Sequence, residues 1–225
     1  MKHILTAFAV LAAAVSLTPA QAQPTATINI YHHNIHSGGQ AQAAANHIVD
    51  LMQMTPQKAL LLINEGNNAR QHFSLPRAGW THIWPNSSHE ERGNPMFARN
   101  APVTVLSSWK MTMNETWTYN GNNRDPRVYT VMKCQLNNHP WVQFHCINVH
   151  FPPKNSTNGP ARQESFDRLI EASENMPGLP LIICGDFNFS ANEVKNRLAD
   201  HIGGRVYSDA NVDHIVVRNG KDIAI

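Results

Sequence analysis

The sequence has few cysteines, little charge and no internal repeat. Only three of its 225 residues are cysteines, and their spacing does not resemble that of a zinc site. Charged residues make up 15%, with 18 Lys and Arg against 16 Asp and Glu, so net charge alone does not predict a polyanion-binding protein. With no low-complexity linker either, a single domain with one sizeable core is expected. These absences argue against a zinc module, a strongly basic domain and a repeat array.

Residues 1–22 have the form of an export signal. Lys2 and His3 make a short polar head before an apolar run over residues 4–17, which is shorter than the ~20 residues that a membrane-spanning helix needs. The segment ends in Ala-Gln-Ala, a small-x-small site for a signal peptidase. We therefore expect a mature domain over residues 23–225 in a secreted or periplasmic protein, with a retained membrane anchor as the weaker alternative.

Two of the cysteines lie on either side of a predicted hairpin turn. Cys134 and Cys146 flank the turn at 137–140 and can form a disulfide if their Cα atoms come within ~7 Å. Two reduced cysteines in the core fit the pattern equally well. Cys184 ends a continuous apolar run from 181 and is expected to be a small buried hydrophobe.

The pattern of apolar residues predicts two crossover units around a block of antiparallel strands. A strand over 26–33, a helix over 40–54 and a buried strand over 59–63 form the first unit. A helix over 161–174 and a buried strand over 181–184 repeat it. This order predicts an α/β fold with two mixed β-sheets packed face to face and helices outside. The remaining predicted elements are strands at 103–106, 115–119, 127–136, 141–149 and 212–217, and a short helix at 193–198.

Polar side chains lie at one end of each predicted buried strand, where a sheet edge can hold a ligand on a rigid scaffold. Each residue taken singly has an ordinary explanation as a turn former or helix cap. Taken together, they predict one site. The residues concerned are Asn34, Glu65, His150, Asp186, Asn188, Asp213 and His214.

The residue types at these strand ends suit chemistry on a phosphate. Glu65 and a further carboxylate can hold Mg²⁺, which prefers oxygen ligands. Asn34 and Asn188 offer neutral hydrogen-bond donors to a phosphate oxygen. His150 can donate to charge developing on the phosphate, and Asp186 can orient the attacking water or accept its proton.

Five short motifs then identify a family resemblance. Tyr-His-His-Asn-Ile-His at 31–36 resembles an opening motif whose strand ends in a functional Asn, and Leu-Leu-Ile-Asn-Glu at 61–65 resembles a strand followed by Gln-Glu. Asn-Val-His-Phe at 148–151 and Val-Asp-His-Ile at 212–215 are similar to later motifs, and Gly-Asp-Phe-Asn at 185–188 matches the most specific signature without departure. In this order, over about 27–217, the chain resembles the endonuclease/exonuclease/phosphatase (DNase I-like) superfamily.

The resemblance implies a DNase I-like four-layer sandwich that cleaves phosphodiester bonds with Mg²⁺ or Mn²⁺. It also implies a role for each matched residue. Glu65 would be a metal ligand with Asn34 beside it, and His150 would contact the scissile phosphate. Asp186 and Asn188 would position the attacking water and the phosphate, and Asp213 would hold a catalytic imidazole. Arg99 and Arg127 would bind phosphate.

The chain departs from the family pattern near its C-terminal end. The family's last motif, Ser-Asp-His followed by an apolar strand, does not occur after Asp213, and Ser208-Asp209 precedes the wrong strand. The chain is then a truncated form, a naturally shortened and weakened relative, or an enzyme in which another histidine has taken the role. His214 is one candidate base, although neighbouring residues on a strand face opposite sides. A sheet without this last strand is also expected to have an uncovered edge.

Fold alone does not choose the substrate. For an exported protein we expect nucleic acid, and hence a secreted nuclease, with no stable protein partner. A sphingomyelinase-like hydrolase acting on a lipid head group is the alternative if Trp109, Trp117 and Tyr119 form an exposed aromatic hairpin. A non-catalytic phosphate-binding relative is the third hypothesis.

Overall fold

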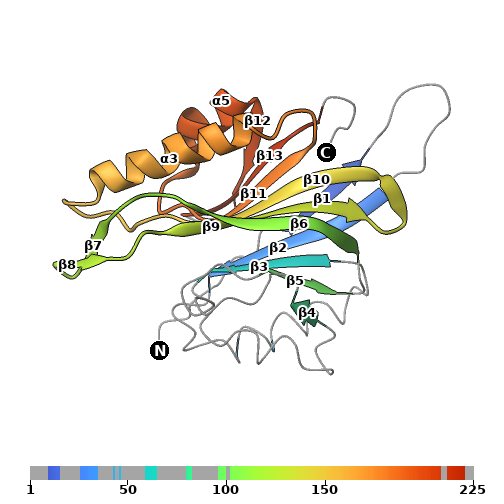
Figure 1. The fold of residues 1–225 in the computed structure, drawn as a ribbon, viewed down its shortest axis with the longest axis horizontal. Helices are drawn as coiled ribbons and strands as arrows, with labels where there is room; N and C mark the ends of the chain where they lie inside the picture. The colour runs from blue at the N-terminus through green and yellow to red at the C-terminus, as the bar shows by residue number, and fades with distance from the viewer. Residues whose placement is uncertain are drawn as a thin grey trace.

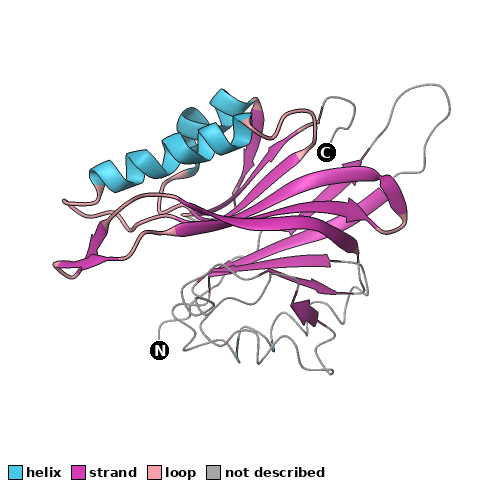
Figure 2. Cartoon of the chain, in the orientation of Figure 1, coloured by secondary structure: helices cyan, strands magenta, loops and turns pink. Residues whose placement is uncertain are grey.

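The computed structural model describes residues 10–15, 26–34, 43, 46, 59–64, 80–82, 96–99, 102–208 and 212–220. Within these residues, two β-sheets lie face to face and a layer of helices covers the outer face of the larger sheet (Figures 1 and 2). The predicted helix over 40–54 and the predicted metal ligand Glu65 lie outside this description, residues 43 and 46 excepted.

The smaller sheet contains five strands in the order β1-β2-β3-β5-β4. β2 and β3 are parallel, as the predicted crossover requires, and their register pairs Asn34 with Asn64 at the carboxyl ends. β1 pairs antiparallel with β2; it falls within the predicted export signal, whose removal stays a prediction. The strands are β1 (Val10–Val15), β2 (Ala26–Asn34), β3 (Ala59–Asn64), β4 (Trp80–His82) and β5 (Met96–Arg99).

The larger sheet has the order β12-β13-β11-β10-β9-β6. β10 and β11 are parallel, β13 runs antiparallel to β11, and the registers place His150, Asp186 and Asp213 side by side on three adjacent strands. The strands are β6 (Val103–Thr112), β9 (Val128–Leu136), β10 (His139–His150), β11 (Leu181–Asp186), β12 (Gly204–Tyr207) and β13 (Asp213–Arg218).

A separate two-stranded hairpin, β7 (Trp117–Tyr119) and β8 (Asn122–Arg124), extends beyond the end of the larger sheet (Figure 1). Its turn contains Asn120 and Gly121, both with positive φ, which suits a tight hairpin connection.

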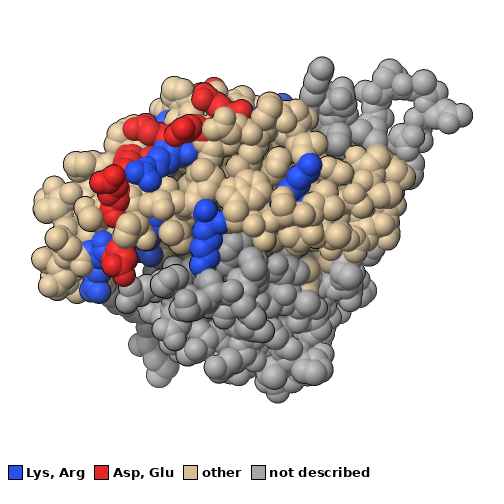
Figure 3. Space-filling view, in the orientation of Figure 1, with Lys and Arg blue, Asp and Glu red and all other residues tan. Residues whose placement is uncertain are grey.

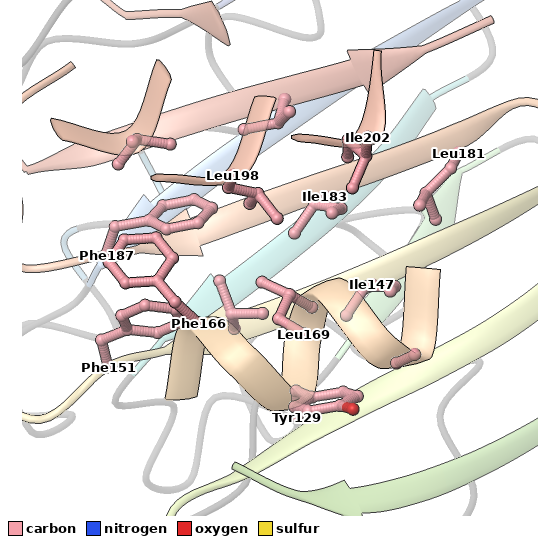
Figure 4. Packing of buried hydrophobic residues seen from close by; sticks show 14 of the residues in the cluster. Tyr129, Ile147, Phe151, Phe166, Leu169, Leu181, Ile183, Phe187, Leu198 and Ile202 are labelled. Atoms are coloured by element: carbon pink, nitrogen blue, oxygen red, sulfur yellow. The ribbon is translucent and has the colours of Figure 1, made fainter. Parts of the chain in front are cut away.

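The helical layer packs on the outer face of the larger sheet through aromatic side chains. Phe151 and Phe166 meet edge to face with ring centroids 4.8 Å apart, and Phe187 lies beside them (Figure 4); aromatic pairs favour such geometry. The layer consists of α3 (Gly159–Glu174), α4 (Ala191–Val194), the π-helical turn η2 (Lys195–Ala199) and α5 (Asp200–Ile202).

The two sheets enclose a second core made by alternate residues of their strands. Ile28, Ile30, Leu60 and Leu62 of the smaller sheet meet such residues as Met132 of the larger sheet. The period of two along a strand puts every second side chain into this layer. The polar residues at the strand ends share that parity, so they lie at one end of the same layer.

All three cysteines are buried and reduced within this layer. Cys134 pairs across the ladder with Phe144, and Cys146 pairs with Met132, so the two cysteines are diagonal neighbours rather than direct partners. Of the alternatives that the sequence left open, the structure contains the reduced core cysteines.

The predicted α/β fold is confirmed. The buried strands and α3 begin and end within about three residues of the predicted positions, except that β6 continues to Thr112. The short strands β4, β5, β8 and β12 were not predicted, because three or four residues give too little periodicity to detect. No helix among the described residues is long and apolar enough to span a membrane.

Candidate active site

The candidate site lies where the layer between the sheets becomes polar. The carboxyl ends of β2, β3, β10 and β11 and the start of β13 meet there. Hydrogen bonds cross from one sheet to the other at this end, over sequence separations of up to 152 residues. The polar side chains that meet at this end, through hydrogen bonds or ion-pair contacts, are His32, Asn34, Asn64, Asn148, His150, Asp186 and Asp213.

Asn64 connects three of these strands from a fully buried position. Its Oδ1 accepts the backbone N–H of Asp186 at 2.7 Å and also contacts Nε2 of His32 at 2.7 Å. Its Nδ2 donates to Oδ1 of Asn148 at 3.1 Å. A buried carboxamide with all these partners fixes the relative position of the two sheets at the site.

Asp186 is the central carboxylate. Oδ2 accepts Nδ2 of Asn34 at 2.9 Å and lies 3.8 Å from Nε2 of His150, while Oδ1 accepts the backbone N–H of Asn188 at 2.7 Å. Burial raises the pKa of this carboxyl to about 6, and the negative charge of Asp213 adds to the effect. The hydrogen bonds from Asn188 and Asn34 act in the opposite direction. A carboxyl with this pKa can hold or release a proton near neutral pH.

His150 lies between Asp186 and Arg127. The guanidinium places Nη1 3.2 Å from Nδ1 and Nη2 3.4 Å from Nε2 of the ring. Burial, with the charges of Arg127 and His32, holds the pKa of His150 well below its usual range, so the ring is neutral. Since a guanidinium only donates, it bonds the ring nitrogen that lacks hydrogen. If that atom is Nδ1, the closer of the two, Nε2–H is left to donate on the Asp186 side.

The Gly-Asp-Phe-Asn signature makes a tight turn after β11. Gly185 has φ 155° and passes so close to β10 that a Cβ there would lie 1.9 Å from the carbonyl oxygen of Val149. Asn188 follows with φ 51° and donates Nδ2 to the carbonyl of Phe151 at 3.0 Å. The buried Arg162 of α3 donates Nη2 to the carbonyl oxygen of Asn188 at 2.8 Å. The predicted site residue Asn188 is therefore brought to the site, and its amide group fixes the turn.

Asp213 and His214 face opposite sides of β13, as expected. Nδ1 of His32 lies 3.4 Å from Oδ1 of Asp213, between the sheets. His214 points into the helical layer, where Nδ1 meets Oγ of Ser208 at 2.8 Å and Nε2 meets the carbonyl oxygen of Phe189 at 2.6 Å. This geometry does not favour His214 as the replacement base.

Arg127 and Arg99, the two predicted phosphate-binding arginines, are placed differently. Arg127 contacts His150, as described. The register of β5 pairs the backbone of Arg99 with Ala59, at the start of β3, roughly 16 Å along the strand from Asn64. The backbone of Arg99 thus lies away from the carboxyl end of β3, because β5 runs antiparallel to β3.

Of the other residues that contact this site, Arg162 was not predicted from the sequence, and His32, Asn64 and Asn148 were noted only as parts of motifs. His32, Asn64 and Asn148 share the two-residue period of the predicted site residues, which was the available signal. Arg162 had no such signal, because it reaches the turn from a helix.

The donor atoms here fit a hard divalent cation. Asp186 and Asp213 repel each other electrostatically, and a cation would offset that repulsion. Their oxygens and the carboxamide oxygen of Asn34 are ligands of the kind that Mg²⁺ prefers. The described residues contain no cluster of three or more His, Cys, Asp and Glu side chains suited to a metal, and the predicted ligand Glu65 lies outside the described part.

Residues 26–223 match the model of the endonuclease/exonuclease/phosphatase family, and the chain belongs to that family. Solved structures share its fold. The human nocturnin catalytic domain with bound sulfate has a TM-score of 0.62 at 15% identity, over 94% of this chain and 85% of that one. A mannosyl-6-phosphatase from Bacteroides thetaiotaomicron has a TM-score of 0.59 at 15% identity, over 84% of each chain. D. rerio TDP2 complexed with a single-stranded DNA product has a TM-score of 0.59 at 12% identity, over 85% and 84%. No curated protein matches the sequence significantly.

Proposed function

We propose that this chain is an exported phosphodiesterase that hydrolyses nucleic acid with the help of Mg²⁺ or Mn²⁺. The observation that carries the proposal is the convergence of Asn34, His150 and Asp186 from three separate strands, with Arg127 against the imidazole. The neutral hydrogen-bond donors Asn34 and His150, the Asp186 carboxyl with its raised pKa and the positively charged guanidinium of Arg127 together suit attack of water on a phosphorus atom.

In the proposed mechanism, Asp186 orients a water molecule and accepts its proton as the water oxygen bonds to phosphorus. His150 donates a ring N–H to a non-bridging phosphate oxygen, and Arg127 keeps the ring in place while contributing positive charge. Asn34 and the predicted ligand Glu65 would hold a divalent cation, which would supply positive charge beside the phosphate. The ester P–O bond breaks as the water oxygen bonds to phosphorus, and the leaving oxygen takes its proton from solvent.

A row of aromatic and cationic side chains, from Arg127 through Trp117 and Tyr119 to Arg124, extends from the site along the β7–β8 hairpin and favours a polynucleotide substrate. The guanidinium of Arg127 lies 4.2 Å from the ring centroid of Trp117, and the Trp117 and Tyr119 rings are 6.3 Å apart. Arg124 then lies 5.6 Å from the Tyr119 ring. Stacking surfaces for bases alternating with cations for phosphates are typical of single-strand binding. The surface in Figure 3 otherwise mixes acidic and basic side chains over the helical layer.

The test is cleavage of a single-stranded DNA, an RNA, a supercoiled plasmid, sphingomyelin and a nitrophenyl phosphodiester by the purified protein with Mg²⁺, Mn²⁺ or EDTA. We expect metal-dependent cleavage of nucleic acid that falls at least about 100-fold in Asp186→Asn and His150→Gln. Asp200→Asn is the matched control, since Asp200 is exposed and pairs with Lys195 on the helical layer. Loss of secreted product after deletion of residues 2–22 tests export.

The alternatives give different results. Turnover of sphingomyelin but not of nucleic acid would support the lipid hydrolase, for which the hairpin supplies Trp117 and the exposed Tyr119. Trp109 does not belong to that hairpin, because it lies on β6 and packs edge to face on His145. Phosphate binding without turnover on any substrate would support the non-catalytic relative.

A further inference from the structure

We propose that His32 is a positioning residue of this site and supplies the imidazole that holds Asp213. The inference rests on the proposed function for its catalytic consequence but on geometry alone for the contact. His32 comes from β2, whereas the sequence pattern placed the imidazole partner of Asp213 in a later motif. The ring reaches across the layer between the sheets, with 3% of its side chain exposed, and its Nδ1 lies 3.4 Å from Oδ1 of Asp213.

The hydrogen positions on His32 follow from its neighbours. Oδ1 of Asn64 accepts the backbone N–H of Asp186, so this atom is the carboxamide oxygen and not the nitrogen. Nε2 of His32 therefore carries a hydrogen that it donates to the same oxygen at 2.7 Å. On the other side of the ring, Nδ1 faces Oδ1 of Asp213 at ion-pair distance, 3.4 Å.

In this arrangement His32 lies between Asp213 on one side and Asn64 on the other. Nδ1 lies within ion-pair distance of Asp213, and Nε2 donates to Asn64, whose oxygen also accepts the backbone N–H of Asp186. Both ring nitrogens are used in these contacts, so His32 positions the carboxylates and does not itself meet the substrate.

The contact is tested first by spectroscopy on protein labelled with ¹⁵N in its histidine rings. The His32 signals are assigned by their loss in His32→Phe, which keeps an aromatic ring at this position. We expect the wild-type spectrum to show Nε2 of His32 protonated and Asp213→Asn to shift the His32 Nδ1 signal. An unprotonated Nε2, or ring signals unchanged by Asp213→Asn, would overturn the inference whether or not the protein has activity.

The catalytic consequence is tested by kinetics on whichever phosphodiester the wild type cleaves. We expect His32→Phe to lower kcat about 10- to 100-fold, as is common when a supporting residue is lost, with KM changed less than about threefold. His32→Gln, which can still donate to one neighbour, should recover part of that loss. The double variant with Asp213→Asn should be no worse than the poorer single variant, because the two residues act as a unit.

The matched control is His201→Phe, since His201 is exposed on α5. Multiplicative effects of the His32 and Asp213 variants, or a His32→Phe protein with wild-type kcat, would refute the positioning role. A wild-type protein that cleaves no phosphodiester would instead refute the proposed function, and the spectra would still decide the contact.

Discussion

The side-chain oxygen of Asn64 accepts the backbone N–H of Asp186 at 2.7 Å, so a residue of one sheet fixes the main chain of the other. The two residues are 122 positions apart. Because Asn64 is fully buried and also bonds His32 and Asn148, it holds the polar end of the layer together.

Truncation of Asn64 should therefore destabilise the whole domain. Asn64→Ala leaves buried partners without hydrogen bonds, each at a cost of ~1–3 kcal/mol, so the free energy of unfolding should fall by about 2–4 kcal/mol. Urea unfolding followed by fluorescence measures the change. Asn192→Ala, at an exposed position of α4, should alter stability by less than about 0.5 kcal/mol. Equal stabilities of the two variants would show that the hydrogen bonds of Asn64 contribute nothing to the free energy of unfolding.

The close approach of β11 to β10 predicts that only glycine is accepted at position 185. A Cβ in Gly185→Ala would lie 1.9 Å from the carbonyl oxygen of Val149 and 2.7 Å from its Cγ2, on a backbone with φ 155°. Overpacking and backbone strain each cost ~1–3 kcal/mol, so we expect a large drop in Tm or an insoluble protein. Gly159→Ala is the control, because a Cβ there meets nothing within 4 Å. A Gly185→Ala protein as stable as this control would contradict the register of the two strands.

Much of this site could be predicted from the sequence, because several buried apolar strands carry polar residues together at one end. Asn34, His150 and Asp186 were found in this way, and the structure joins them. The alternation along β13 also separated Asp213 from His214 correctly.

The contacts between the two sheets could not be predicted. A two-residue period says which face a side chain occupies, but not which residue of the opposite sheet it meets. His32 and Asp213 are 181 positions apart and meet only because the sheets align at one end. The position of Arg99 could not be predicted for a similar reason, since the sequence does not show that β5 pairs antiparallel with β3.

Acid should destabilise the protein through His145. Burial, and then the charges of Lys133 and Arg218, lower the pKa of this histidine from 6.5 to about 4 in the folded state. As pH falls, the unfolded chain takes up the proton first, so the stability from the neutral ring is complete above about pH 6.5 and is lost towards pH 4.

Urea midpoints between pH 7.5 and 4.5 measure this effect. We expect His145→Phe, which keeps a ring against Trp109, to lose less stability over this interval than the wild type. His201→Phe should follow the wild-type curve, since His201 is exposed. Parallel curves for the wild type and His145→Phe would show that other groups cause the acid sensitivity.

The row of aromatic and cationic side chains on the hairpin predicts that loss of Tyr119 weakens binding of some substrates and not of others. Tyr119 is 48% exposed, and stacking of a base on an aromatic ring contributes ~1–3 kcal/mol. Tyr119→Ala should therefore raise KM for a single-stranded oligonucleotide about 5- to 100-fold while leaving the hydrolysis of methyl nitrophenyl phosphate, which is too small to reach the hairpin, within about twofold. Trp141→Ala is the matched control, because Trp141 is exposed to a similar extent, 52%, but lies near the start of β10, nine residues from His150. If both variants raised KM alike, nonspecific contacts would explain the affinity. If Tyr119→Ala impaired only sphingomyelin hydrolysis, the hairpin would serve a lipid surface and the substrate class proposed above would be wrong.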